Sequence, residues 1–385
     1  MTTLASKTKT IFHKKFSCQS KCVSMAPARI NIIGEHTDYN SGLSLPSAID
    51  IWLCIAMRKR EDKRIRVYSE NLKKFREFDL KNSDKYENLW EKYIFGCLYE
   101  FNKIYRIDCG LDVCIYSDIP IGTGISSSAA LEVAFINGLS SIFNLSIDNN
   151  SIIKMCQKVE HNHIKIQSGV LDQSAVLLSK GNFLLLLDFL NDSFDYHPYN
   201  LTSCDWVLVD SGIKRELANS SYQDRVNECK RGLQLLKDSF SQIKTLRDIT
   251  IDQLNHLKSY DLTSYNRIKH VFYENQRVGS MLASINDDDK VKCGKYLVES
   301  HNSLRDLYEV SCKEIDFLIN NSMNIDGWYG GRIMGGGFGG QVINLIESEK
   351  FKFYKEEISN QYFESFNIIP TIQKINFVKG AEVIF

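Results

Sequence analysis

The chain has 385 residues, and its 47 lysines and arginines balance 47 aspartates and glutamates. This neutral balance gives no electrostatic reason to expect binding to nucleic acid or to an anionic membrane, so a small-molecule ligand fits better. At this length two domains are more common than a single core.

The cysteines and the hydrophobic runs narrow the class further. The 11 cysteines are scattered, and neighbours such as Cys18 and Cys22 lack the second pair that would complete a zinc site. No run approaches the ~20 apolar residues of a membrane span, and the start of the chain lacks the pattern of a signal peptide. We therefore expect a cytoplasmic protein with reduced thiols and no membrane contact.

Strands and helices are expected to alternate in the first half of the chain. Strand segments are rich in β-branched and aromatic residues or alternate in polarity, whereas helical segments repeat apolar residues every three or four positions. In chain order we expect a strand over 52–57, a helix over 91–105, a strand around 111–115, helices over 126–144 and 151–163, and a strand over 183–187.

Beyond about residue 188 the pattern becomes more helical. One helix face is expected to carry Tyr222, Val226, Cys229, Leu233 and Leu236. Further helices are expected within 263–284, 291–302 and 311–321, and strands over 206–209, over 341–346 and near the C terminus. The sequence predicts an α+β protein with two domains, 1–190 and 191–385, although no Pro/Gly-rich linker marks the boundary.

A glycine- and serine-rich stretch opens the helix expected over 126–144. Residues 120–130 read Pro-Ile-Gly-Thr-Gly-Ile-Ser-Ser-Ser-Ala-Ala. Glycines let the backbone approach oxygen atoms closely, and the first N–H groups of a helix have no internal partner, so together they can hold a polyphosphate. Read alone, the stretch is equally a serine-capped helix after a turn. No Walker-type G-x-x-x-x-G-K-[ST] sequence occurs, which excludes a phosphate loop of that type with its lysine.

Two further stretches are too rich in charge or glycine for ordinary core elements. Residues 26–40 place several polar side chains around an apolar isoleucine segment, namely Arg29, Glu35, His36, Asp38 and Asn40. Residues 335–340 contain five glycines in six positions, which is more than a tight turn requires.

In these three stretches the chain resembles the galactokinases of the GHMP small-molecule kinase superfamily. The family signatures read approximately APGRxNLIGEHTDYNGG, PxGxGLSSSA and GARMTGGGFGG, and the matching stretches occur here in the same order and at similar spacing. Residues 90–96, 168–173, 220–225 and 300–312 are also similar, so the resemblance spans nearly the whole chain. It implies a two-domain GHMP-kinase-like fold with the active site in the cleft between the domains.

The resemblance implies ATP-dependent phosphorylation of the anomeric hydroxyl of galactose. Asp172 matches the family's catalytic aspartate, and Arg29 beside it would favour the charged carboxylate and help to neutralise the transferring group. By the same resemblance the sugar would be bound by Glu35, His36, Asp38, Gly169 and Tyr222. ATP would be bound by Pro120, Gly122, Gly124, Ser126, Ser127, Ser128, Ala129 and Trp90.

A kinase of this kind is also expected to use Mg²⁺ with its ATP. Mg²⁺ prefers hard oxygen ligands and keeps several waters, so one hydroxyl and one carboxylate suffice. Ser128 and Glu160 match the family's metal-binding positions. The alternatives are that Ser128 is only a helix cap and Glu160 only an exposed helix residue. On local sequence alone, the interpretation of Asp172 as a helix-start residue is favoured.

Three positions depart from the family pattern. Ala28 replaces a glycine, which is tolerable if its φ is negative. Lys165 stands where a glycine is usual, and Gln341 stands where cysteine is common. None of these changes removes a chemical group that the proposed reaction needs.

The sequence leaves other functions open. N-acetylgalactosamine and arabinose are alternative sugars, whereas Glu35 argues against a uronic acid because its carboxylate would meet a like charge. A non-catalytic sensor of galactose and ATP is a further alternative. Loss of the serine loop or of the base would mark such a sensor, and here the serine loop, Arg29 and Asp172 are all present.

Overall fold

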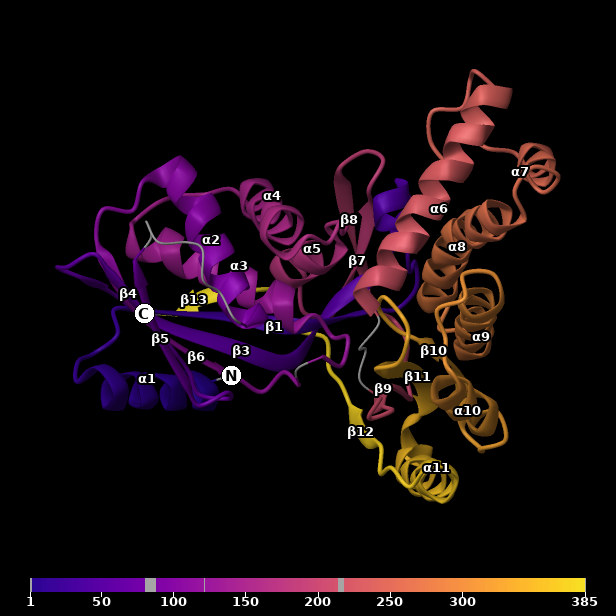
Figure 1. Ribbon diagram of the computed structural model, residues 1–385. Coiled ribbons are helices and arrows are strands. Elements are labelled where there is room, and N and C mark those ends of the chain that lie inside the picture. Colours follow the sequence, from indigo (N-terminus) through magenta and orange to yellow (C-terminus); the bar gives the residue numbers. More distant parts are fainter. Residues whose placement is uncertain (1, 80–87, 121, 214–217, 385) are drawn as a thin grey trace.

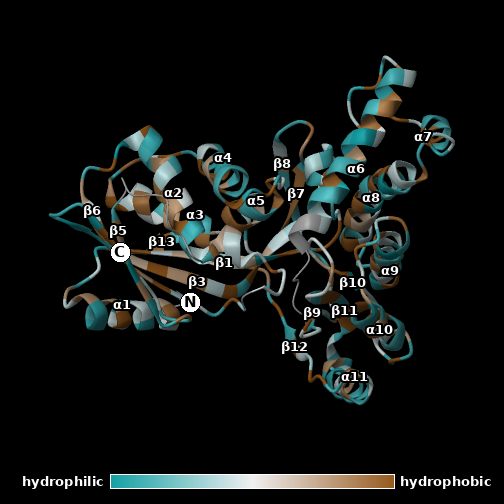
Figure 2. Ribbon diagram, in the orientation of Figure 1, coloured by the Kyte–Doolittle hydropathy of each residue, from teal (hydrophilic) through white to brown (hydrophobic). Residues whose placement is uncertain are grey.

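The computed structural model describes residues 2–79, 88–120, 122–213 and 218–384 (Figure 1). It confirms the mixed α+β composition, with three separate sheets and helices packed on them. Figure 2 shows hydrophilic residues on the outward sides of the helices, as expected for helices that bury one face against a sheet.

A six-stranded sheet forms the centre of the first half. Its strands are β1 (Cys22–Asn31), β3 (Pro46–Arg60), β4 (Arg64–Ser69), β5 (Lys74–Asp79), β6 (Gly110–Ser117) and β13 (Glu382–Ile384). The spatial order is β13-β1-β3-β6-β4-β5, and every neighbouring pair is antiparallel except β4 and β6. Every residue of β1 is buried, because helices cover both faces of the sheet.

The helices of the first half lie on both faces of this sheet. Helix α1 (Thr2–Phe16) lies on one face, where Phe12 and Phe16 join a buried cluster with Trp52 and Cys54. On the other face lie α2 (Leu89–Tyr105), α3 (Ser127–Ile142), α4 (Asn149–Val159) and α5 (Leu171–Leu178). Of these, α3 packs against β1 and β3, which brings the start of α3 close to the end of β1.

The second half consists of a four-stranded sheet and a group of helices. The sheet has the order β10 (Trp328–Ile333), β11 (Gln341–Glu347), β9 (Cys204–Asp210) and β12 (Thr371–Lys374), all antiparallel. The helices are α6 (Ala218–Ser239), α7 (Ile251–Leu257), α8 (Leu262–Asn286), α9 (Lys290–Asp306), α10 (Lys313–Ser322) and α11 (Phe351–Phe366). A small sheet of β2 (Leu43–Ser44), β7 (Phe183–Asp188) and β8 (Ser193–Pro198) lies between the two halves.

The larger hydrophobic core joins the two halves. It contains Ile30 and Phe135 from the first half together with Trp206, Val278 and Leu297 from the second. The last strand also returns to the first sheet, because β13 pairs with β1. The boundary near residue 190 stays a prediction. Within the described residues, no helix is long and apolar enough to cross a bilayer.

The structure confirms the helices and strands expected from the sequence, with boundaries that differ by a few residues. One difference matters for the site: the helix expected over 151–163 ends at Val159 and continues as a π-helical turn, Glu160–Ile164. The sequence did not predict the helices α1, α5, α7 and α11 or the strands β1, β4 and β5. Helix α1 has only a short apolar face, and its packing on the sheet rather than its local propensity stabilises it.

Candidate active site

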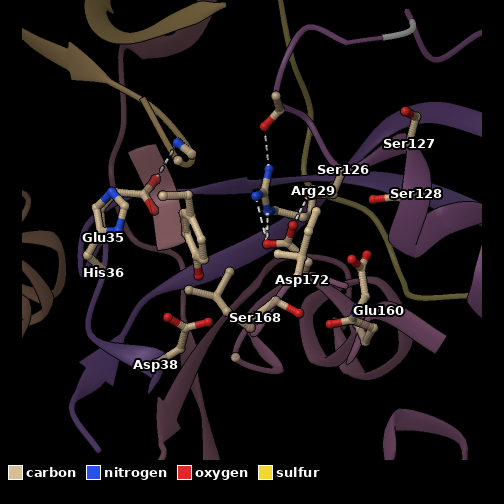
Figure 3. A pocket seen from close by; sticks show the side chains of 18 of the residues that line it. Arg29, Glu35, His36, Asp38, Ser126, Ser127, Ser128, Glu160, Ser168 and Asp172 are labelled. Carbon is tan, nitrogen blue, oxygen red and sulfur yellow. Dashed lines mark hydrogen bonds and ion pairs between the residues drawn. The ribbon is translucent and has the colours of Figure 1, made fainter. Parts of the chain in front are cut away.

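The three motifs meet in one cavity of about 400 Å³. Its lining includes thirteen of the residues expected from the sequence: Arg29, Glu35, His36, Asp38, Gly122, Gly124, Ser126, Ser127, Ser128, Glu160, Gly169, Asp172 and Tyr222. Figure 3 shows the side chains of the first motif on one side of the cavity and the serine loop on the other, with Arg29 and Asp172 between them. The cavity size is typical of small-ligand sites.

Asp172 is held by two polar side chains from distant parts of the chain. It lies in the first turn of α5, and its Oδ1 accepts hydrogen bonds from Arg29, at 2.8 Å from Nε and 2.6 Å from Nη2. The Ser126 hydroxyl donates to Oδ2. Arg29 also donates to the carbonyl of Gly124 at 2.6 Å, so it connects the acid to the serine loop. The Asp172 side chain remains 34% exposed, which leaves it accessible to a ligand.

The serine loop leaves the start of α3 uncapped. Ser126 occupies the N-cap position with φ 60°, and its side chain makes no capping hydrogen bond because it turns toward Asp172. Gly122 and Gly124 also have positive φ, at 79° and 88°. The first N–H groups of a helix lack internal partners, so this helix end is suited to an anion.

Glu35 is buried and paired across the two halves of the molecule. Its Oε1 accepts from the Gly335 N–H at 2.7 Å and from Arg332 Nη2 at 3.2 Å. Burial opposes the charge of this carboxyl, but Arg332, then Arg29, and the Gly335 N–H outweigh burial, so its pKa lies below the usual value. The glycine run therefore supports the first motif directly, through a backbone donor.

His36 is a neutral imidazole among aromatic rings. Burial lowers the pKa of His36 to about 3. The ring centroid lies 4.5 Å from that of Tyr308 and 5.7 Å from that of Tyr222, and Nδ1 lies 2.8 Å from the Tyr39 hydroxyl. The backbone of His36 has φ 60°, a strained conformation for a residue with a side chain.

Asp38 and Gly169 fit together in the lining of the cavity. A Cβ on Gly169 would collide with the Asp38 carboxylate, so only glycine leaves room for it. Burial, and then the charge of Asp172, raise the pKa of Asp38 to about 7. An acid that is half-buried and poorly compensated is ready to accept hydrogen bonds from ligand hydroxyls.

Glu160 and Ser128 form the part of the lining that suits a cation. Glu160 is 6% exposed, and among the described residues its side chain receives only a long hydrogen bond from Tyr93, at 3.4 Å. Burial, and then Asp172, raise its pKa to about 7, and burial raises the pKa of neighbouring Glu132 well above its usual value. A bound cation would relieve this cost. In the described part of the chain no group of three or more His, Cys, Asp or Glu could hold a metal alone, so further ligands would come from phosphate and water.

Three expected ATP-binding residues do not line the cavity. Trp90 lies half-buried in the first turn of α2, Pro120 is exposed, and Ala129 is fully buried in α3. Their role in ATP binding stays a prediction. Leu89 and Tyr93, from the same turns of α2 as Trp90, do line the cavity.

Sequence reasoning missed the support that α8 gives to the first motif. Glu274, which is fully buried, accepts from the Gly34 N–H at 3.0 Å, from Ser300 at 2.7 Å and from Arg277 at 2.7 Å. No motif marks this position. Only the 3.6-residue spacing of α8 indicated that one of its faces is buried.

Ala28 and Lys165 replace glycines of the family signatures, and they differ in how well a residue with a side chain fits the backbone conformation. Ala28 is fully buried in β1 and does not have positive φ, so alanine fits there. Lys165 has φ 69° at the end of the π-helical turn, which is the conformation that favours glycine. The turn that carries Glu160 therefore ends in a strained residue.

Comparisons with known proteins agree with this arrangement. Two family models match: the GHMP kinases N terminal domain over residues 92–180 and the galactokinase galactose-binding signature over residues 10–59. The chain is 37% identical to a galactokinase of Thermosipho africanus, covering 92% of this chain and 98% of that one. It is 34% identical to a galactokinase of Clostridium acetobutylicum, covering 99% and 98% of the two chains.

Solved structures give the same result. Lactococcus lactis galactokinase complexed with galactose superposes with a TM-score of 0.92 at 30% identity, covering 98% of this chain and 99% of that one. Methanococcus jannaschii mevalonate kinase, at 17% identity and a TM-score of 0.68, shares the fold alone. With three motifs converging on one cavity and such identity along almost its full length, the chain belongs to the galactokinase family.

Proposed function

We propose that the protein transfers the γ-phosphoryl group of ATP to the anomeric hydroxyl of galactose, giving galactose 1-phosphate and ADP. The observation that carries this proposal is the position of Asp172. Its carboxylate, bound by Arg29, faces a cavity that also contains an uncapped helix start suited to phosphates and a set of polar groups suited to a sugar. The relatives named galactokinase, and the Lactococcus lactis galactokinase complexed with galactose, support galactose as the sugar.

In the proposed reaction Asp172 is the general base. The anomeric oxygen forms a bond to the γ-phosphorus while the bond from phosphorus to the ADP oxygen breaks, and the hydroxyl proton passes to the Asp172 carboxylate. Arg29 keeps that carboxylate oriented and contributes positive charge near the transferring group. Positioning and charge stabilisation supply most of the rate enhancement in such reactions.

The sugar would be held by the first motif and its neighbours. We assign galactose binding to Glu35, His36, Asp38, Gly169 and Tyr222, which all line the cavity. Carboxylates can accept from two adjacent hydroxyls, and Tyr222 provides an aromatic wall beside His36. N-acetylgalactosamine and arabinose are the alternative sugars of the same site.

ATP would be held by the serine loop. We assign its phosphates to the segment 122–128 at the start of α3, and we keep Pro120, Ala129 and Trp90 as predicted contacts. Ser128 and Glu160 would hold Mg²⁺, whose charge would stabilise the negative β- and γ-phosphates. The poorly compensated Glu160 carboxyl supports this assignment.

We also propose that the protein works in the cytoplasm without a nucleic-acid or membrane partner. ATP is the co-substrate, and all 11 cysteines are free, which suits a reducing compartment.

The proposal is tested by measuring ADP release with a panel of sugars. Galactose should give the highest kcat/KM among galactose, N-acetylgalactosamine, arabinose, glucose and galacturonate, and mevalonate should give none. A tenfold preference for N-acetylgalactosamine or arabinose would assign the site to that sugar instead. Binding of galactose and ATP without turnover would favour the sensor.

A further inference from the structure

A chain of hydrogen bonds runs from the cavity into the second half of the molecule. His36 Nδ1 lies 2.8 Å from the Tyr39 hydroxyl, this hydroxyl lies 2.9 Å from that of Tyr308, and the Tyr308 hydroxyl lies 3.1 Å from Cys229 Sγ. Tyr39 belongs to the short helix η1 (Asp38–Asn40), Tyr308 follows α9, and Cys229 lies on α6. The chain thus links the imidazole ring to η1, to the segment after α9 and to α6.

The ring at the end of this chain has one unused nitrogen. His36 is neutral, because burial lowers its pKa to about 3, so one ring nitrogen carries a proton and the other accepts. Nδ1 is engaged by Tyr39. Nε2 is buried and has no hydrogen-bond partner among the described residues, although the ring lines the cavity. A bound ligand is therefore the partner that Nε2 lacks.

The direction of the chain follows from the strength of its donors and acceptors. Cys229 is 1% exposed and burial raises the pKa of its thiol to about 11, so the sulfur keeps its proton. A thiol is a weak donor and a weak acceptor, whereas a phenol is a good donor and a neutral imidazole nitrogen a good acceptor. If each group donates to the next in the direction from His36 to Cys229, the Tyr308 hydroxyl donates to sulfur, which is a weak acceptor. If each group donates in the opposite direction, the Tyr308 hydroxyl donates to the Tyr39 oxygen and the Tyr39 hydroxyl donates to Nδ1, so both phenols have good acceptors.

We propose that Tyr39, held by Tyr308 and Cys229, fixes His36 as the tautomer protonated on Nε2, so that His36 donates a hydrogen bond to a sugar oxygen. Tyr39 is the positioning residue in this arrangement, because it alone bonds to Nδ1 among the described residues. A sugar hydroxyl that accepts from Nε2 can donate its own proton to a carboxylate, so the imidazole and the acids of the first motif recognise complementary sides of the hydroxyls. The inference rests on the proposed function only for the identity of the ligand, because the tautomer is a property of the free protein.

The decisive measurement is the nitrogen spectrum of protein labelled with ¹⁵N-histidine, in the absence of sugar. The two ring nitrogens of a neutral histidine resonate far apart, and long-range couplings to the ring protons show which one carries hydrogen. The His36 signals are those lost in His36→Gln. We expect Nε2 to be the protonated nitrogen in the wild-type protein.

Variants then test the role of Tyr39. Tyr39→Phe should mix the two tautomers and raise the KM for galactose roughly fivefold or more, with kcat and the KM for ATP within about twofold, since one positioning hydrogen bond is lost. Tyr308→Phe should keep the proton on Nε2, because Tyr39 still donates to Nδ1. Tyr354→Phe is the matched control: it removes a fully buried hydroxyl that pairs with Ser322 at 3.0 Å, outside the cavity, and should change neither spectrum nor KM.

Protonation of Nδ1 in the wild-type protein would overturn the proposal. So would a Tyr39→Phe protein with the wild-type spectrum and wild-type KM, or a Tyr308→Phe protein in which the proton moves to Nδ1. A different result would contradict the proposed function rather than the tautomer assignment. In that case no sugar of the panel is phosphorylated, while the spectrum still reports the proton on Nε2 and supports the tautomer assignment.

Discussion

At the scale of single residues, Asp172 and Arg29 carry the proposed chemistry as one unit. Asp172→Asn keeps the shape of the side chain and removes its charge, so kcat should fall by about 10²–10⁴ while sugar and ATP still bind. Adding Arg29→Ala should cost much less than the sum of the two single losses, because both residues serve one step. Single-turnover kinetics and binding titrations measure the two effects separately.

The matched control for this pair is Asp148→Asn, which alters an acid at the exposed N-cap of α4. It should leave kcat unchanged. An Asp172→Asn protein that retains more than about a tenth of the activity would contradict the assignment of the base. Fully additive losses would instead separate Arg29 from the proton transfer.

Asp38 should give sugar binding a pH dependence near neutrality. Its pKa of about 7 means that the folded, ligand-free protein protonates this carboxyl as the pH falls through 7. A protonated acid is a poorer acceptor, so the affinity for galactose without nucleotide should weaken below pH 7, approaching about tenfold per pH unit for one linked proton. Calorimetric titration with galactose across this range measures it.

Two variants isolate the cause of that dependence. Asp38→Asn should bind weakly at every pH and show a flat profile. Glu160→Gln removes the other cavity carboxyl whose pKa is near 7 and should keep the profile. The role given to Asp38 would be contradicted if the galactose affinity of the wild-type protein did not change with pH. It would also be contradicted if the pH dependence disappeared in Glu160→Gln.

At the scale of elements, α8 supports the first motif through the buried Glu274. Burial opposes its charge, but Arg277 and further neighbours outweigh burial and lower its pKa to about 2. Because this value lies below the ordinary ~4.3, the group stabilises the fold above that pH and the contribution is lost as the pH falls from there through about 2. Glu274→Gln should lower the free energy of unfolding at pH 7 by about 3–5 kcal/mol, since it leaves Arg277, whose side chain is only 12% exposed, without its ion partner.

Urea unfolding at several pH values checks this prediction. The difference in the free energy of unfolding between the wild-type protein and Glu274→Gln should become smaller as the pH approaches 2, because Glu274 of the wild-type protein is then neutral. Glu299→Gln on α9, whose side chain is 43% exposed, is the control and should change the free energy of unfolding by less than about 1 kcal/mol. A difference in the free energy of unfolding that does not change with pH would contradict a stabilising role for the charge of Glu274.

At the scale of the whole molecule, Arg332 joins the two halves. It lies fully buried on β10, donates to the carbonyls of Asn31 and, at 2.8 Å, Ile32 at the end of β1, and pairs with Glu35. Since the halves also share a hydrophobic core, we expect the wild-type protein to unfold in one calorimetric transition. Arg332→Met should lower the free energy of unfolding by about 3–5 kcal/mol, because Glu35 is left as an unpaired buried charge.

The same variant should raise the KM for galactose, because Glu35, which also accepts from the Gly335 N–H, loses its charged partner. Arg305→Met is the control: Arg305 is half-buried and pairs only with its neighbour Asp306 among the described residues, so its loss should leave the thermal transition in place. An Arg332→Met protein as stable as wild type would mean that the shared core alone holds the halves together. The division near residue 190 stays a prediction that limited proteolysis can address.

The sequence alone determined the elements and the chemistry of the site. The serine loop, the charged first motif and the glycine run are local patterns, and backbone geometry near a glycine or a helix start is set by neighbouring residues. The sequence therefore predicted the start of α3 and, through the family resemblance, thirteen residues that line one cavity.

Only the tertiary structure decided how these residues are paired and charged. Asp172 and Arg29 are 143 positions apart, and Glu35 and Arg332 are 297 apart, so no local pattern relates them. Nothing in the sequence indicated that the Ser126 hydroxyl donates to Asp172, which follows from the left-handed backbone of Ser126. The pKa values of Asp38 and Glu160 near 7 and of His36 near 3 arise from burial, a property that exists only once distant segments pack together and exclude water.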